Sequence, residues 1–149
     1  MNNKELLLQI DKFNNTKILV IGDIMLDNFI YGEVNRISPE APVPVFKFKE
    51  NKEILGGAGN VVANLSSLKC KVKFIGIVGD DEAGKKISKL LLNLKAHSHL
   101  LKLKDYKTIT KTRLISKHNH ILRFDEEEKL PIIDSLIPRF EKILIKAIK

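Results

Sequence analysis

Short, uninterrupted apolar runs constrain the fold of this chain more than any other feature. Residues 17–22 read Lys-Ile-Leu-Val-Ile-Gly, residues 71–78 carry a second such run, and residues 97–103 are predicted to form a third strand. Continuous apolar runs of this length are typical of strands that are buried on both faces of a parallel sheet. Apolar residues at helical spacing fill the two intervals, over residues 58–68 and 81–94. This alternation of strands and helices predicts an α/β fold with a parallel sheet flanked by helices.

Two further segments are predicted to lie off this sheet. Residues 28–50 alternate only partly between apolar and polar side chains, and three prolines interrupt them. This pattern indicates a small, half-exposed antiparallel piece whose prolines mark edges or loops. Residues 108–116 and 120–125 are predicted to form a hairpin.

Helices are expected near both ends of the sequence. Residues 4–12 have apolar side chains three and four positions apart, which indicates a short helix. Residues 132–148 follow Pro131 and are predicted to form a final helix, with a break near Pro138.

Composition excludes several classes of function. The 149 residues carry a net charge of +8, but the lysines are scattered, so we do not expect a nucleic-acid-binding surface. No apolar run approaches the roughly 20 residues of a membrane helix, and no secretory signal is visible. The four histidines lack the cysteine or carboxylate spacing of a zinc site. The single cysteine, Cys70, cannot form an internal disulfide, so we expect a reducing, cytoplasmic environment.

Two nucleotide-binding motifs are nearly present, and both are rejected. Gly57 and Gly59 resemble the start of a dinucleotide fingerprint, but Val62 occupies the third glycine position. Residues 79–86 have the spacing of a phosphate-binding loop, but Lys86 stands where a Ser or Thr should bind magnesium. Three carboxylates in that segment would also repel a phosphate.

Two segments are candidates for binding a small molecule. Residues 56–60 read Gly-Gly-Ala-Gly-Asn before a predicted helix, where glycines let the backbone approach a ligand and free N–H groups point toward it. The amide of Asn60 can donate to and accept from hydroxyl groups. Asp23 and Asp27 follow the first buried strand, at the sheet edge where α/β proteins bind ligands. A plain tight turn and helix-capping aspartates remain open as alternatives.

Longer segments resemble one family. Residues 20–27 (VIGDIMLD) are similar to the first strand of ribokinase-type (PfkB) carbohydrate kinases. Residues 55–65 (LGGAGNVVANL) resemble the N-terminal signature of that family, and residues 76–84 (GIVGDDEAG) resemble its second turn. The resemblance extends over nearly the whole chain and implies a ribokinase-like parallel sheet with a small β lid.

A second group of segments resembles one branch of this family. Residues 36–45 (RISPEAPVPV) and residues 108–116 with 122–127 are similar to the kinase domain of the bifunctional heptose enzymes of lipopolysaccharide synthesis. This resemblance implies an ATP- and Mg²⁺-dependent enzyme that phosphorylates C1 of D-glycero-β-D-manno-heptose 7-phosphate.

The resemblance also implies roles for individual residues. Segments 28–48 and 107–125 would form the lid over the sugar, and such lids pair to make homodimers. The ligands of the sugar hydroxyls would be Asp23, Asp27, Gly56, Gly57 and Asn60. The ligands of the phosphate that the sugar already carries would be Lys111, Arg113 and Arg123, with Arg36 a weaker candidate. Ordinary surface charge on the hairpin is the alternative role for these cations.

One part of the family pattern is absent from the sequence. The family's general base lies in a Gly-Ala-Gly-Asp turn, and these 149 residues contain no such turn. We therefore expect the chain to be the N-terminal part of a kinase domain, inactive alone, without the ATP-binding catalytic part and without the adenylyltransferase domain. Two alternatives remain: another ribokinase-type sugar or nucleoside kinase, or a non-catalytic relic that dimerises through its lid.

Overall fold

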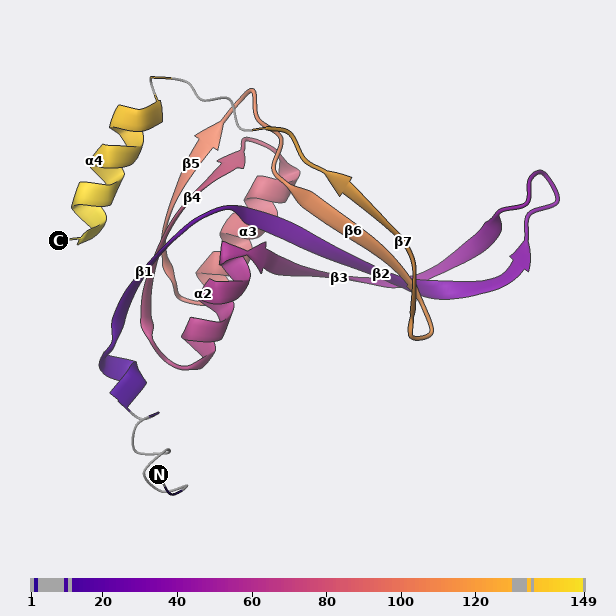
Figure 1. Ribbon diagram of the computed structural model, residues 1–149, viewed down its shortest axis with the longest axis horizontal. Coiled ribbons are helices and arrows are strands. Elements are labelled where there is room, and N and C mark those ends of the chain that lie inside the picture. Colours follow the sequence, from indigo (N-terminus) through magenta and orange to yellow (C-terminus); the bar gives the residue numbers. More distant parts are fainter. Residues whose placement is uncertain (1, 3–9, 11, 130–133, 135, 149) are drawn as a thin grey trace.

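Two β-sheets organise the chain. The computed structural model describes residues 2, 10, 12–129, 134 and 136–148. Figure 1 shows one sheet packed among helices, which we call the body, and a second sheet that extends away from it as a long ribbon, which we call the lid. The elements are, in chain order, a 3-10 helix (Lys12–Asn15), β1 (Lys17–Ile21), β2 (Ile24–Ile37), β3 (Pro44–Gly57), α2 (Ala58–Ser67), β4 (Lys71–Gly79), α3 (Glu82–Asn93), β5 (His97–Leu103), β6 (Thr110–Ser116), β7 (Asn119–Glu126) and α4 (Leu136–Ile148).

The body is built on a parallel sheet, as predicted, and its strand order is β1-β4-β5. Its central strand, β4, is well buried, with Phe74 and Ile75 inaccessible to solvent. The prediction that β1 is buried on both faces was wrong, because Ile21 at its end is 47% exposed. β1 is the edge strand of the sheet and has a neighbour on one side only, so its side chains are covered less completely.

The lid is a four-stranded sheet with strand order β3-β2-β6-β7. The predicted antiparallel piece is the pair β2–β3, and the predicted hairpin is the pair β6–β7. A parallel pairing of β2 with β6 joins the two, with Asn28 opposite Thr112. β3 continues as far as Gly57, so Gly56 and Gly57 end a strand that leads directly into α2.

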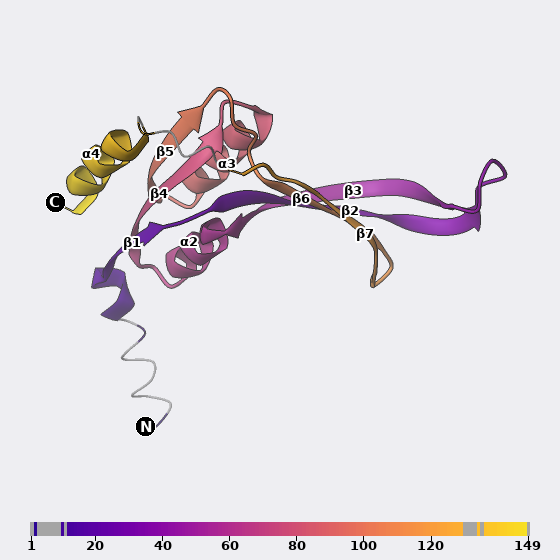
Figure 2. The same cartoon turned by 45° about the horizontal axis from the view of Figure 1, so that its top comes forward.

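The hydrophobic core lies where the root of the lid meets the body. It is formed by side chains from both sheets and from α2 and α3, namely Ile24, Leu26, Leu55, Val62, Val72, Phe74, Val78, Ile87 and Leu91. Figure 2 shows the rest of the lid edge-on, as a thin layer that extends beyond these helices. The core therefore holds the root of the lid and leaves most of the ribbon outside the body.

The predicted helices are confirmed where the structure describes them. α2 and α3 match the two predicted helices of the body. α4 begins at Leu136, and Pro138 stands in its first turn, where a missing N–H removes no helical hydrogen bond and causes no break. Most of the predicted helix over residues 4–12 lies outside the described residues. Every described helix is too short or too polar to cross a membrane.

Candidate functional site

One face of the lid collects most of the charged candidate residues. Paired residues of neighbouring strands share a face of a sheet. The register places Asp27 beside Lys111 and Lys111 beside Asp125, and the next row on this face holds Phe29, Arg113 and Arg123. We call this surface the charged face and define it by Asp27, Phe29, Lys111, Arg113, Arg123 and Asp125.

An ion pair between β2 and β6 lies at the centre of the charged face. Nη1 of Arg113 donates a hydrogen bond to Oδ1 of Asp27 over 2.6 Å, and both side chains are 17% exposed. The guanidinium carbon also lies 5.0 Å from the centre of the Phe29 ring, which is within the range of a cation–π contact. Arg113 and Asp27 therefore form one half-buried unit in which the planar guanidinium contacts both a carboxylate and an aromatic ring.

A second cluster of charges flanks this pair. Nζ of Lys111 donates to Oδ2 of Asp125 over 3.0 Å and to Oε2 of Glu127 over 3.2 Å. Hydrogen bonds to Asp125 and then Glu127 raise the pKa of Lys111, and the bond from Lys111 is the main cause of the lowered pKa of Asp125. Lys111 is therefore a permanent cation whose contacts with carboxylates a phosphate would have to replace.

The glycine-rich segment forms a tight junction between β3 and α2. Gly57 has a φ of +57°, and a Cβ atom there would lie 2.5 Å from the carbonyl oxygen of Asp23. The N–H of Ala58 donates to that same oxygen over 2.8 Å. No side chain caps the N-terminus of α2, and Asn60 lies exposed in its first turn. The junction thus ties the backbone of Asp23 to the start of α2 and leaves the amide side chain of Asn60 exposed.

Gly56 connects this junction to the charged face. A Cβ atom on Gly56 would lie 2.5 Å from Oδ2 of Asp27, so the carboxylate of Asp27 rests directly against the Gly56 backbone. The absence of a side chain at this position therefore lets the ion pair of the lid approach the glycine junction. Both groups of candidate residues belong to one continuous region at the root of the lid.

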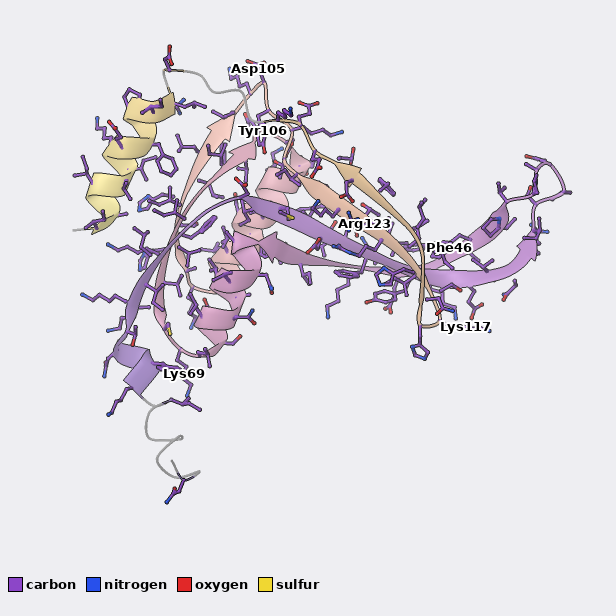
Figure 3. The ribbon with its side chains drawn as sticks, viewed as in Figure 1. Phe46, Lys69, Asp105, Tyr106, Lys117 and Arg123 are labelled. Atoms are coloured by element: carbon purple, nitrogen blue, oxygen red, sulfur yellow. The ribbon has the colours of Figure 1, made fainter. Side chains whose placement is uncertain are left out.

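Two candidate arginines lie farther from this region. Arg123 is 57% exposed on β7 and contacts Asp125, with 3.1 Å between Nε and Oδ1 (Figure 3). Arg36 lies near the far end of the lid and lines a separate cavity of about 410 Å³ together with Phe46 and Lys47. The structure therefore places Arg123 at the rim of the charged face and separates Arg36 from it.

Tyr106 was not predicted as a candidate, although the structure places it near Asp23. It is buried in the segment between β5 and β6, at the top of the body in Figure 3. Burial, followed by the negative charges of Asp23 and Asp81, raises the pKa of its phenol. A lone tyrosine in a lysine-rich connection carries no periodicity, so no local pattern pointed to it.

The rejected phosphate-loop motif has a structural role instead. The N–H of Gly84 donates to Oδ1 of Asp81 over 2.7 Å, and the N–H of Gly79 donates to the hydroxyl of Thr108 over 2.8 Å. These backbone donors, which would bind phosphate in a true phosphate loop, are already satisfied within the protein.

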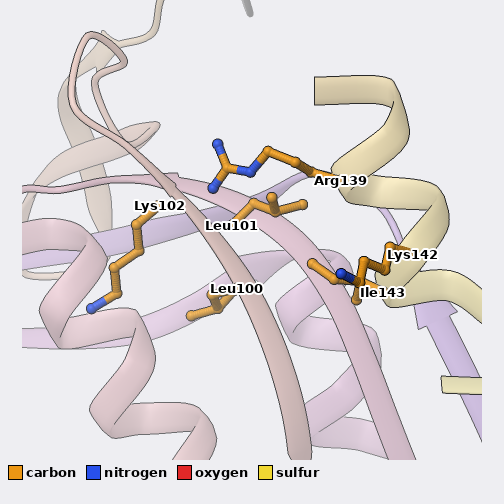
Figure 4. A pocket seen from close by; sticks show the side chains of 6 residues that line it. All are labelled: Leu100, Leu101, Lys102, Arg139, Lys142 and Ile143. Carbon is orange, nitrogen blue, oxygen red and sulfur yellow. The ribbon is translucent and has the colours of Figure 1, made fainter. Parts of the chain in front are cut away.

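A second cavity lies away from the candidate site. It has a volume of about 500 Å³ between β5 and α4, and its charged lining residues are Lys102, Arg139 and Lys142. Figure 4 shows the side chain of Lys102 running away from the other two, so the cations do not converge on one ligand position. Within the described ranges, no group of three or more His, Cys, Asp or Glu side chains is placed to bind a metal ion.

Comparisons with known proteins agree on one family. The sequence pattern described as pfkB family carbohydrate kinase matches residues 15–145. The chain is 46% identical over 133 residues to the bifunctional protein HldE of Actinobacillus pleuropneumoniae serotype 5b, covering 88% of this chain and 28% of that protein. It is 48% identical over 124 residues to bifunctional protein HldE of Haemophilus ducreyi, covering 83% of this chain and 26% of that protein.

Solved structures show the same fold. A carbohydrate kinase from Agrobacterium tumefaciens superposes with a TM-score of 0.61 at 24% identity, over 74% of this chain and 35% of that one. Ribokinase from Giardia lamblia superposes with a TM-score of 0.60 at 20% identity, over 88% of this chain and 42% of that one. The chain thus spans between a quarter and a third of the length of its curated relatives and has the ribokinase-like α/β fold. It belongs to the pfkB family of carbohydrate kinases.

Proposed function

We propose that this chain forms the sugar-binding part of a kinase that phosphorylates C1 of D-glycero-β-D-manno-heptose 7-phosphate. The observation that carries the proposal is the close approach of two kinds of ligand group at the root of the lid. Gly57 and the exposed Asp23 and Asn60 offer groups for sugar hydroxyls. The Asp27–Arg113 pair next to them offers a charged, half-buried guanidinium. A sugar that already carries a phosphate matches both kinds of group.

Each group has a distinct role in this proposal. Asp23, Asn60 and the backbone of Gly56 and Gly57 bind the hydroxyl groups of the sugar ring. Arg113 and Lys111 bind the existing phosphate, and Asp27 holds Arg113 in place until the substrate arrives, with Arg123 at the rim. The lid covers the bound sugar and excludes water, which prevents ATP from being hydrolysed in place of sugar transfer.

We also propose that the phosphoryl transfer itself depends on residues beyond these 149. Among the described residues, no group of three or more His, Cys, Asp or Glu side chains gathers to hold a metal ion, and the sequence holds no Gly-Ala-Gly-Asp turn to supply a general base. ATP and Mg²⁺ are accordingly placed mostly on the part of the kinase domain that would follow this one. The purified 149-residue chain is expected to show no ATP-dependent phosphorylation of the sugar, and robust turnover would contradict this part of the proposal.

A calorimetric titration tests the substrate. The chain is titrated with heptose 7-phosphate, ribose, fructose 6-phosphate and adenosine, and only the first is expected to bind. Lys111→Gln should weaken that binding by at least about tenfold, because it removes a charge-assisted hydrogen bond to the phosphate. Lys49→Gln is the matched control, because Lys49 pairs with Glu33 at an exposed position farther out on the lid. Binding of adenosine or ribose alone would instead favour another kinase of the family.

The face of the lid opposite the charged face supports a proposal about assembly. Leu122 and Phe124 are 52% and 46% exposed on it, and Ile30 and Leu114 lie half-buried on the same side. We propose that a second copy of the chain covers this apolar surface and makes a homodimer. Sedimentation should show a dimer that Phe124→Glu converts to a monomer, whereas a strictly monomeric wild-type chain would contradict the proposal.

A further inference from the structure

The connection between β5 and β6 is fastened to the body by a compact set of hydrogen bonds. The hydroxyl of Thr108 donates to Oδ1 of Asp81 over 2.7 Å, and the N–H of Thr108 donates to Oδ2 over 2.8 Å. Asp81 also accepts the N–H of Gly84 over 2.7 Å, and the Thr108 hydroxyl accepts the N–H of Gly79 over 2.8 Å. We call Asp81 and Thr108 the clamp, because these four bonds join the end of β4, the start of α3 and the connection to the lid.

The surroundings of the clamp leave little room for an alternative arrangement. Thr108 is 1% exposed, so loss of its hydroxyl would leave buried polar groups without a partner. A Cβ atom on Gly79 would lie 2.2 Å from the carbonyl oxygen of Tyr106, and one on Gly84 would lie 2.4 Å from that of Gly79. The two glycines let three backbone segments meet where side chains would keep them apart.

The clamp lies at the attachment of the lid. Immediately after Thr108, the carbonyl oxygen of Ile109 accepts the N–H of Leu26, and β6 then begins at Thr110. Lys111 and Arg113 follow on that strand, three and five positions beyond Thr108. The start of β6 therefore pairs with β2, and the clamp holds the residues immediately before it. The other neighbour of β6, the strand β7, belongs to the lid itself, so the clamp ties the connection that leads into β6 directly to the body.

We infer that Asp81 and Thr108 are positioning residues for the candidate sugar-phosphate site. The clamp sets the start of β6 relative to the body, and so sets Lys111 and Arg113 relative to Asp23, Gly57 and Asn60. This inference rests on the proposed function, because it assumes that one substrate bridges the two groups. Neither clamp residue contacts the substrate in this arrangement, so their effect on binding is transmitted through β6.

A merely structural role predicts a different result from a positioning role. Loss of a bond that only stabilises the fold speeds hydrogen exchange equally at all core amides, because these amides exchange through global unfolding. A bond that positions the lid affects amide exchange in β6 more than amide exchange in the body. Thr108→Val removes the hydroxyl at nearly constant shape, and Thr108→Ser restores it. Ser88→Ala is a matched control, because the Ser88 hydroxyl donates to the carbonyl oxygen of Gly84 over 2.8 Å but does not contact the lid connection.

The experiment measures amide hydrogen exchange and heptose 7-phosphate affinity on the same set of chains. In Thr108→Val we expect exchange of the β6 amides to rise at least about tenfold more than exchange in β4. We expect its affinity for heptose 7-phosphate to fall at least about tenfold, with Thr108→Ser and Ser88→Ala within about threefold of the wild type. Equal increases in β4 and β6, or unchanged affinity in Thr108→Val, would overturn the positioning role.

The outcome for the wild-type chain separates this inference from the proposed function. If the wild type binds no heptose 7-phosphate, the proposed function is wrong, and the exchange data alone still decide whether the clamp holds the lid. If the wild type binds heptose 7-phosphate and the Thr108→Val chain binds it equally tightly, the proposed function stands and the clamp has no positioning role.

Discussion

Arg113 and Asp27 are 86 residues apart in sequence, yet Nη1 of Arg113 lies 2.6 Å from Oδ1 of Asp27 at the root of the lid. Their strands, β6 and β2, run parallel, and the register places Phe29 rather than Asp27 directly opposite Arg113. The guanidinium therefore stacks on its direct neighbour and reaches diagonally to the carboxylate. The side chain of Arg113 thus contacts two residues of the neighbouring strand β2.

Arg113→Gln should weaken both the fold and the site. The free energy of unfolding is expected to fall by about 1–3 kcal/mol, because the half-buried carboxylate of Asp27 loses a charged partner. Urea unfolding measures this loss. Lys49→Gln is again the control, since its exposed pair with Glu33 should contribute less than about 1 kcal/mol. If both substitutions lower the free energy of unfolding equally, the Arg113–Asp27 pair stabilises the fold no more than an exposed ion pair does.

Gly57→Ala should be far more damaging than the same change at Gly22. The backbone of Gly57 has a φ of +57°, and a Cβ atom would lie 2.5 Å from the Asp23 carbonyl oxygen. Relief of that overlap would displace Asp23 and the start of α2, at a cost of about 2 kcal/mol or more. At Gly22 the nearest atom is the Ala58 Cβ at 3.2 Å, and φ is not positive.

Thermal unfolding followed by circular dichroism compares the two alanine variants. A melting temperature for Gly57→Ala within a degree of that for Gly22→Ala would contradict the tight junction described above. Titration with heptose 7-phosphate at a temperature well below both transitions then separates loss of the site from loss of the fold.

The body of the fold could be predicted from the sequence because its signals are local. Burial of β4 produces a continuous apolar run, and packing of α3 on one side produces the spacing of Ile87 and Leu91. The full extent of β3 was missed because residues 49–54 are mostly polar, and tertiary pairing with β2 holds them in a strand regardless. The register of long-range pairs is not encoded in any single segment.

The candidate site was predicted only in part, for a related reason. Residue types marked Asp27, Lys111 and Arg113 as ligand candidates, but the pairing of these charges depends on the β2–β6 register. Lys111 in particular already contacts two carboxylates from β7 and beyond, which its position in the sequence does not reveal. Thr108 was missed because a buried hydroxyl in a polar connection has no local pattern.

Lys95→Gly is expected to stabilise the protein. Lys95 follows the C-terminus of α3 with a φ of +56°, and Lys69 follows α2 with a φ of +63° (Figure 3 labels Lys69). The N–H of Lys95 donates to Leu92 and that of Ala96 to Leu91, which is the hydrogen-bond pattern of a glycine-ended helix. Glycine adopts this conformation without strain, so the free energy of unfolding should rise by about 0.5–1 kcal/mol.

Chemical unfolding measures this gain, and the interior of the same helix supplies the control. Lys89→Gly, at an exposed position within α3, should instead lower the free energy of unfolding by about 1 kcal/mol, because glycine has a low propensity for the interior of a helix. Changes of the same sign at both positions would contradict the argument from backbone conformation.

The acid stability of the protein should depend on Asp81. Burial raises the pKa of this carboxyl group, but hydrogen bonds from the N–H groups of Thr108 and Gly84 and from the Thr108 hydroxyl outweigh it, so the pKa lies below its ordinary value of 3.8. A group with a lowered folded-state pKa contributes stability above its unfolded pKa and loses it as the pH falls through the folded value. Asp81→Asn should therefore be less stable than the wild type near neutral pH, and the difference should shrink below about pH 4.

Urea unfolding between about pH 7 and pH 2.5 follows that difference directly. Other carboxylates, such as Asp125, also have a lowered pKa and make both chains less stable in acid. Only the gap between the wild type and Asp81→Asn isolates Asp81, because the contributions of the other groups cancel. Asp105→Asn, at an exposed position of the same connection, should show no such difference from the wild type in the free energy of unfolding. If the stability difference between the wild type and Asp81→Asn stays constant to the lowest pH, the hydrogen bonds that Asp81 accepts do not depend on its charge.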